Sequence, residues 1–251
     1  MLQLNRPVVL SIAGYDPCGG AGLLADIKTF EQHKVYGLGI VSALTLQTEK
    51  EFFSLDWTNE REMLKQLKTF LSYYPIKVVK FGLAQSWKMT NKMVKLIKAH
   101  NDKIKIIIDP VLKTSTGYAI FTYQDNRMFT TVLRQIDLLT PNSNEAVMLS
   151  GERNYRKAGK YLSQYCNVLL KGGHNRTERG TDLFFSANSL FTIKPGISKV
   201  YPKHGSGCVL SAAIASNFAF GKGLRESCIL AKNYTEGFLK SNKSLIGYHV
   251  Q

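Results

Sequence analysis

A single cysteine directly behind two glycines is the residue whose position in this chain most suggests chemistry. The stretch KHGSGCVLSAA (residues 203–213) places Cys208 after Gly205, Ser206 and Gly207, where a helical pattern begins. Glycines let backbone N–H groups turn toward a ligand, and the positive end of a helix dipole favours anions and thiolates. The pattern predicts an anion cradle beside a proton-accepting thiol, with a small buried packing residue as the alternative for Cys208.

The spacing of the cysteines argues against a metal centre or a disulfide framework. The chain has four cysteines and no C-x-x-C pair, at positions Cys18, Cys166, Cys208 and Cys228. Such usage is typical of a reducing compartment. The apolar run near the N-terminus stops at Gly14, which is too short for a membrane span. We therefore expect a cytoplasmic protein that does not associate with a membrane.

The net charge of +15 is the unusual total of the composition. Nucleic-acid binding would predict basic residues gathered with aromatic residues in one stripe. The lysines are instead scattered, as in the set Lys65, Lys68, Lys77 and Lys80, or spaced along a helix, as in the set Lys88, Lys92 and Lys95. We interpret them as solvated positions and expect no nucleic-acid partner. The positive electrostatic potential of such a protein also favours a phosphorylated ligand.

Apolar runs alternate with helical patterns along the whole chain. Strands are predicted over residues 8–13, 35–46, 76–82, 104–110, 137–142 and 167–173, and a hairpin over 182–194. Helices are predicted from residue 20 to 30 and over 63–71, 89–100, 143–150, 210–221 and 224–243. This alternation predicts one α/β domain over residues 1–251, with a mostly parallel sheet flanked by helices.

Doubly wound sheets bind their ligands at the carboxyl ends of the strands. The distinctive residues of this chain follow the predicted strands at those ends: Gly14, Asp16, Gln47, Leu83, Asp109, Val111, Asn142, Glu145, Lys171 and Gly173. Their common placement predicts a single crevice.

Motifs of other nucleotide enzymes and hydrolases are missing, including the P-loop, a G-x-G-x-x-G after the first strand, and G-x-S-x-G. The residues that remain suit phosphoryl transfer, which needs a cradle, a cation on the phosphates and acids that organise a metal. Asp109 and Glu145 suit Mg²⁺ and Lys171 suits a phosphate. The alternatives are local caps for the two acids and a solvated lysine.

Several motifs, in order and spanning nearly the whole chain, resemble the hydroxymethylpyrimidine/phosphomethylpyrimidine kinase family of thiamine biosynthesis, in the ribokinase superfamily. They read SIAGYDPCGGAGLLADIKTF (11–30), KFGLAQS (80–86), IDPV (108–111), TPNSNEA (140–146), KGGH (171–174) and HGSGCVLSAAIASNFAFGKG (204–223). The resemblance implies a ribokinase-like three-layer αβα fold and the use of ATP and Mg²⁺. It also implies phosphorylation of 4-amino-5-hydroxymethyl-2-methylpyrimidine, then of its monophosphate, and a homodimer.

The resemblance also implies roles for single residues. Cys208 would be the base, and the backbone from Gly205 through Ser206 to Gly207 the anion hole. Lys171, Asn142 and Gly173 would bind ATP, and Asp109 and Glu145 would organise Mg²⁺. The pyrimidine site would contain Gln47, Ala21, Thr45, Leu83, Val111, Asp16 and Gly14.

The chain departs from the family pattern at Tyr15, Cys18, Thr48-Glu49 and Leu83, and in the segment after Asp109. Pyridoxal kinase activity remains an alternative, because related enzymes phosphorylate a ring hydroxymethyl with a similar Gly-x-Gly-Cys segment. A non-catalytic pyrimidine- or nucleotide-binding regulator is a third hypothesis. A complete phosphoryl-transfer set argues against it.

Overall fold

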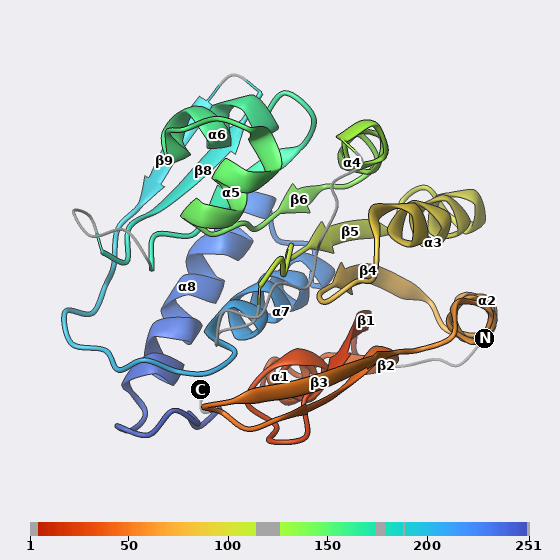
Figure 1. Cartoon of the computed structure of the whole chain (residues 1–251), viewed down its shortest axis with the longest axis horizontal. Helices are drawn as coiled ribbons and strands as arrows, with labels where there is room; N and C mark the ends of the chain where they lie inside the picture. Colours follow the sequence, from red (N-terminus) through yellow and green to blue (C-terminus); the bar gives the residue numbers. More distant parts are fainter. Residues whose placement is uncertain (1–4, 114–125, 174–178, 188, 250–251) are drawn as a thin grey trace.

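A nine-stranded sheet forms the centre of the computed structural model, which describes residues 5–113, 126–173, 179–187 and 189–249 (Figure 1). The strand order is β3-β2-β1-β4-β5-β6-β7-β8-β9. The strands are β1 (Val8–Tyr15), β2 (Tyr36–Gln47), β3 (Phe52–Trp57), β4 (Ile76–Phe81), β5 (Lys105–Ile108), β6 (Leu138–Leu139), β7 (Asn167–Leu170), β8 (Asp182–Ser186) and β9 (Ser189–Ile193).

Helices cover both faces of this sheet. They are α1 (Gly22–Gln32), α2 (Glu60–Tyr73), α3 (Trp87–His100), α4 (Asn126–Leu133), α5 (Ser143–Ser150), α6 (Tyr155–Leu162), α7 (Ser206–Ala219) and α8 (Leu224–Lys240). Side chains alternate along each strand, so Leu10 packs with α2 to α6 on one face, and its neighbour Val9 packs with α1, α7 and α8 on the other. The three-layer αβα architecture expected from the sequence is confirmed.

The parallel strands bring their carboxyl ends to one edge of the sheet. β1 pairs in parallel with β2 and β4, and the parallel ladder continues through β5 and β6 to β7. Among the described strands, only β3 and β8 run in the opposite direction, and β9 pairs antiparallel with β8. Helix α7 begins at the same edge, and Asn142 forms a parallel bridge with Lys171 there.

The alternation of strands and helices, the hairpin of β8 and β9, and the last two helices agree with the sequence prediction. Three elements were not predicted. β3 lies outside the core and has no buried residue to reveal it, and the other two are the short helices α4 and α6. No helix among the described residues has the length and apolarity needed to cross a membrane.

Candidate active site

A cleft of about 1260 Å³ opens at the carboxyl edge of the sheet. Every residue predicted for the site lines this cleft: Gly14, Asp16, Ala21, Thr45, Gln47, Leu83, Asp109, Val111, Asn142, Glu145, Lys171, Gly173, Gly205, Ser206, Gly207 and Cys208. Residues 114–121 of the divergent segment, and the histidine of KGGH, lie outside the described part of the chain. The structure thus brings residues from seven segments into one site.

The start of α7 needs glycine for two separate reasons. Gly205 is the N-cap residue with a φ of 74°, and a Cβ there would lie 2.0 Å from the carbonyl oxygen of Gly20. A Cβ on Gly207 would lie 3.3 Å from Nζ of Lys171 and 3.6 Å from Oδ2 of Asp109. The first turn of α7 therefore approaches a cation and a carboxylate across a gap that side chains would fill. Backbone N–H groups at a helix start are suited to bind an anion in such a gap.

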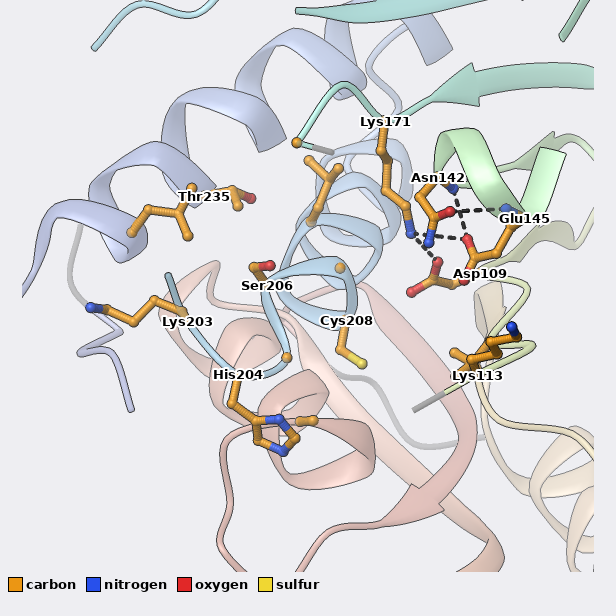
Figure 2. A pocket seen from close by; sticks show the side chains of 18 of the residues that line it. Asp109, Lys113, Asn142, Glu145, Lys171, Lys203, His204, Ser206, Cys208 and Thr235 are labelled. Atoms are coloured by element: carbon orange, nitrogen blue, oxygen red, sulfur yellow. Dashed lines mark hydrogen bonds and ion pairs between the residues drawn. The ribbon is translucent and has the colours of Figure 1, made fainter. Parts of the chain in front are cut away.

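Asp109 and Lys171 form the charged centre of the cleft (Figure 2). Lys171 Nζ donates to Oδ1 of Asp109 at 2.6 Å and lies 4.0 Å from Oε2 of Glu145. Asp109 also accepts hydrogen bonds from Thr140 and Ser211. Burial would raise the pKa of Asp109, but the charge of Lys171 lowers it below its ordinary value. Asp109 is therefore a carboxylate at neutral pH, and Lys171 is an ammonium that its partners keep charged.

Glu145 serves the helix cap and faces the cleft at once. Its side chain accepts a hydrogen bond from the backbone N–H of Asn142 at 2.7 Å, and the Asn142 side chain accepts one from the N–H of Glu145 at 2.9 Å. This capping box fixes Glu145 on the first turn of α5. Burial raises the pKa of Glu145 to about 7, although Lys171 opposes the shift. The carboxyl is thus balanced between its two protonation states near neutral pH.

Cys208 lies on the first turn of α7, with His204 on one side and the Asp109–Lys171 pair on the other (Figure 2). All four cysteines are free, as the sequence predicted. Burial raises the pKa of the Cys208 thiol to about 11, against the lowering effect of Lys80. The thiol form of Cys208 therefore predominates at neutral pH, and only the minor thiolate fraction can accept a proton.

The loop after β1 is held by Asp16. Its carboxylate accepts hydrogen bonds from the backbone N–H groups of Ala21, at 2.8 Å, and Cys18, at 3.1 Å, and Oδ2 lies 3.0 Å from Nε2 of His204. The thiol of Cys18 donates to the same carboxylate. Cys18 thus has a carboxylate partner only two residues away in the chain. Asp16 joins the loop that precedes α1 to the segment that precedes α7.

The side of the cleft formed by β2 and β3 carries the residues expected around the pyrimidine. Thr45 Oγ1 donates to the carbonyl of Tyr15, and Gln47 Nε2 donates to Thr45 Oγ1, both at 2.9 Å. Gln47 lines the cleft, and Phe52 on β3 adds an aromatic ring to the lining. This wall offers hydrogen bonds together with an apolar surface.

Sequence reasoning misplaced one charged residue of the site. Lys80 was interpreted as solvated, but its side chain is fully buried and lines the cleft beside an ion pair with Asp26. Lys88, Lys92 and Lys95 are exposed as predicted. His204 and Lys203, which precede the α7 cradle, are also buried site residues that no predicted role covered.

The three-layer fold and the strand-end cleft define a kinase of the ribokinase-like class. The family model described as phosphomethylpyrimidine kinase matches residues 16–250 of the chain. The chain belongs to this family.

Individual relatives agree with this assignment. A hydroxymethylpyrimidine/phosphomethylpyrimidine kinase of Aquifex aeolicus is 30% identical over 97% of this chain and 98% of its own length. The solved phosphomethylpyrimidine kinase of Clostridium difficile superposes with a TM-score of 0.78 at 28% identity, over 92% of this chain and 98% of that chain. A Staphylococcus aureus pyridoxal kinase in complex with pyridoxal superposes with a TM-score of 0.83 at 26% identity, over 94% of this chain and 88% of that chain.

Proposed function

We propose that this protein phosphorylates the hydroxymethyl group of 4-amino-5-hydroxymethyl-2-methylpyrimidine with ATP and Mg²⁺, and then converts the monophosphate to the diphosphate. The observation that carries the proposal is the convergence of the α7 cradle and the Asp109–Lys171–Glu145 group on one cleft. Family membership supports the pyrimidine as the acceptor. Solved relatives named as complexes with an ATP analogue support ATP as the donor.

The first transfer assigns one task to each part of the cleft. Gln47 and its neighbours orient the pyrimidine, and Cys208 takes the proton of its hydroxyl group. The hydroxyl oxygen then forms a bond to the γ-phosphorus of ATP, the bond from that phosphorus to the β-phosphate oxygen breaks, and ADP leaves with the electron pair. Backbone N–H groups from Gly205 to Gly207 stabilise the charge on the transferring oxygens. Lys171, with Asn142 and Gly173 beside it, binds the phosphates.

The donor set around Lys171 fits a magnesium ion. Asp109 and Glu145 offer carboxylate oxygens on the cleft, and Mg²⁺ is ordinarily held by one or two carboxylates together with phosphates and water. When bound, the ion neutralises charge on the phosphate oxygens. Lys171 is fixed by these two carboxylates and so keeps its ammonium directed at the same place.

The decisive experiment follows ADP formation with the hydroxymethylpyrimidine, its monophosphate and pyridoxal assayed in parallel. Cys208→Ala should lose at least about 100-fold in turnover, within the range for loss of a general base, while calorimetry still detects Mg²⁺–ATP binding. Cys228→Ala is the matched control, since that thiol is buried in α8 and should leave turnover unchanged. Full activity of the Cys208→Ala variant would remove the base assignment.

Pyridoxal is the second candidate acceptor. The likeness to the pyridoxal-bound Staphylococcus aureus enzyme favours it, because that structure covers 94% of this chain. A higher kcat/KM for pyridoxal than for the hydroxymethylpyrimidine would reverse our assignment of the substrate.

We further propose that residues 1–251 act as one kinase domain in the cytoplasm, where the thiol of Cys208 stays reduced.

The chain is proposed to be a homodimer joined through the outer part of β2 and β3. Leu44, Leu46 and Phe53 support this, as each exposes more than half of its surface there. Analytical ultracentrifugation tests it: Leu46→Lys should yield monomers, and a monomeric wild type would contradict the proposal.

A further inference from the structure

A fully buried ion pair below the start of α7 has no task in the mechanism given so far. Lys80 Nζ donates to both carboxylate oxygens of Asp26, at 2.9 and 2.7 Å, and both side chains are 0% exposed. Ser11 donates a further hydrogen bond to Asp26 at 2.6 Å. Burying two charges costs free energy, and packed apolar side chains often stabilise a core equally well. Stability alone does not explain why the core contains this pair.

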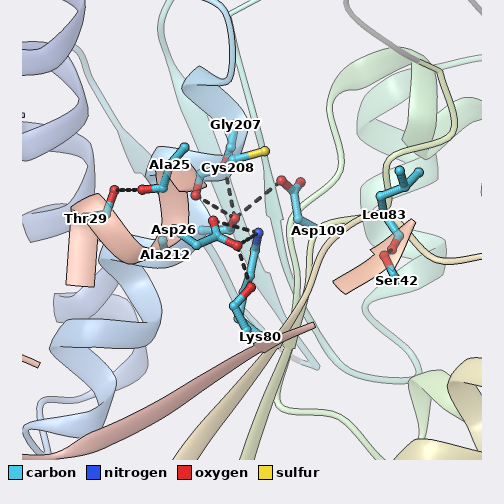
Figure 3. A network of polar contacts seen from close by, with 12 residues as sticks. Ala25, Asp26, Thr29, Ser42, Lys80, Leu83, Asp109, Gly207, Cys208 and Ala212 are labelled. Carbon is cyan, nitrogen blue, oxygen red and sulfur yellow. Dashed lines mark hydrogen bonds and ion pairs between the residues drawn. The ribbon is translucent and has the colours of Figure 1, made fainter. Parts of the chain in front are cut away.

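The position of Lys80 connects the pair to the site (Figure 3). Its side chain rises from β4 to Asp26 beneath the first turn of α7, with Cys208 and Asp109 close by. Lys80 lines the same cleft as Cys208, and a Cβ on Gly82 would lie 3.1 Å from its Nζ. Because water does not reach this ammonium, its field is screened far less than that of a surface lysine.

Several charged groups face the thiol of Cys208, each from a different element. Lys80 on β4 and Lys171 after β7 are cations, whereas Asp26 on α1 and Asp109 after β5 are anions. The helix start of α7 and the N–H of Gly22 add positive partial charge. Burial raises the pKa of the thiol, Lys80 lowers it, and Asp26 and Asp109 raise it. The two members of the ion pair thus act on Cys208 in opposite directions.

We propose that Lys80 is a positioning residue for the transfer reaction: its buried ammonium stabilises the thiolate of Cys208, and Asp26 fixes that ammonium in place. This proposal rests on the proposed role of Cys208 as base. In the proton transfer from the substrate hydroxyl to Cys208, the S–H bond forms as the substrate O–H bond breaks, so the sulfur starts as a thiolate and ends as a thiol. Loss of that proton to water restores the thiolate before the next turnover.

The test measures the thiol directly and needs no substrate. The full-length protein is alkylated with iodoacetamide between pH 7 and 10.5, and mass spectrometry follows the peptide that contains Cys208, so the other cysteines do not interfere. Lys80→Met should slow alkylation at a fixed pH by about tenfold, which corresponds to a thiol pKa about one unit higher. Asp26→Asn should accelerate it, because an opposing charge is lost while Asp109 still favours the charged form of Lys80.

The opposite signs distinguish an electrostatic role from a structural one. Both variants break the same ion pair, so a purely structural role would change the alkylation of Cys208 in the same direction in both. Equal directions, or no change in either, would overturn the proposal. If Lys80→Met does not fold, as checked by circular dichroism, the acceleration in Asp26→Asn decides alone. A failure of Cys208→Ala to lose kinase activity would remove the base role but leave these alkylation rates interpretable.

Discussion

Replacing Lys171 with methionine should leave Asp109 and Glu145 as neighbouring buried carboxylates without the cation between them. The Nζ atom lies 2.6 Å from Asp109 and 4.0 Å from Glu145. At an effective dielectric constant of about 20, attractions over these distances amount to about 6 and about 4 kcal/mol before the cost of desolvation. Breaking a buried pair of this kind lowers the free energy of unfolding by about 3–5 kcal/mol.

A divalent cation should reverse part of this loss. Without Lys171 the two carboxylates no longer share a competing ammonium, so Mg²⁺ should bind them more tightly than in the wild type. Mg²⁺ at about 10 to 30 times its dissociation constant adds about 1.4–2 kcal/mol to the free energy of unfolding. Urea unfolding with and without MgCl₂, in the absence of ATP, measures this gain. Turnover should fall at least about tenfold, because the contact with the phosphates is lost.

Lys80→Met is the control, since it also removes a buried lysine but leaves the single, fully enclosed carboxylate of Asp26. It should be destabilised in a similar way and gain no more from Mg²⁺ than the wild type does. An equal Mg²⁺ response of Lys171→Met and Lys80→Met would refute the assignment of Asp109 and Glu145 to the metal.

Two further predictions concern Gly205 at the start of α7 and Glu145. Gly205→Ala should lower the free energy of unfolding by at least about 2 kcal/mol and abolish most turnover, because its Cβ would meet the Gly20 carbonyl. Gly151→Ala is the control, since Gly151 also has a positive φ (+75°) but open space around it. That substitution should lower the free energy of unfolding by only about 1 kcal/mol and keep full activity. Because the folded-state pKa of Glu145, about 7, lies above the ordinary 4.5, its ionisation destabilises the fold as pH rises from 4.5 to 7. Glu145→Gln should therefore unfold at higher urea than the wild type at pH 8 without Mg²⁺, with the difference shrinking toward pH 4.5; a difference independent of pH would contradict this.

The site could be located from sequence because the topology of the fold is reflected in local patterns. Each parallel strand forms a short apolar run, and the polar residues directly after these runs must meet at one edge of the sheet. Asp109, Glu145 and Lys171 were found in this way, although no local pattern shows that a single lysine lies between two acids. Strand β3 was missed for the opposite reason. It adds to the edge of the sheet without entering the core, so its residues lack a buried face.

Lys80 shows how a charged residue inside a strand can be interpreted. β4 is covered by helices on both faces, so a residue near its carboxyl end is buried whichever face it points to, whereas Lys77 near its start remains exposed. A lysine in such a position needs a buried counter-charge. That partner, Asp26, lies 54 residues earlier, on helix α1 over the neighbouring strand β1, so spacing could not identify it. A lysine that interrupts an apolar strand directly before a ligand-binding edge is therefore better interpreted as part of the site than as a solvated residue.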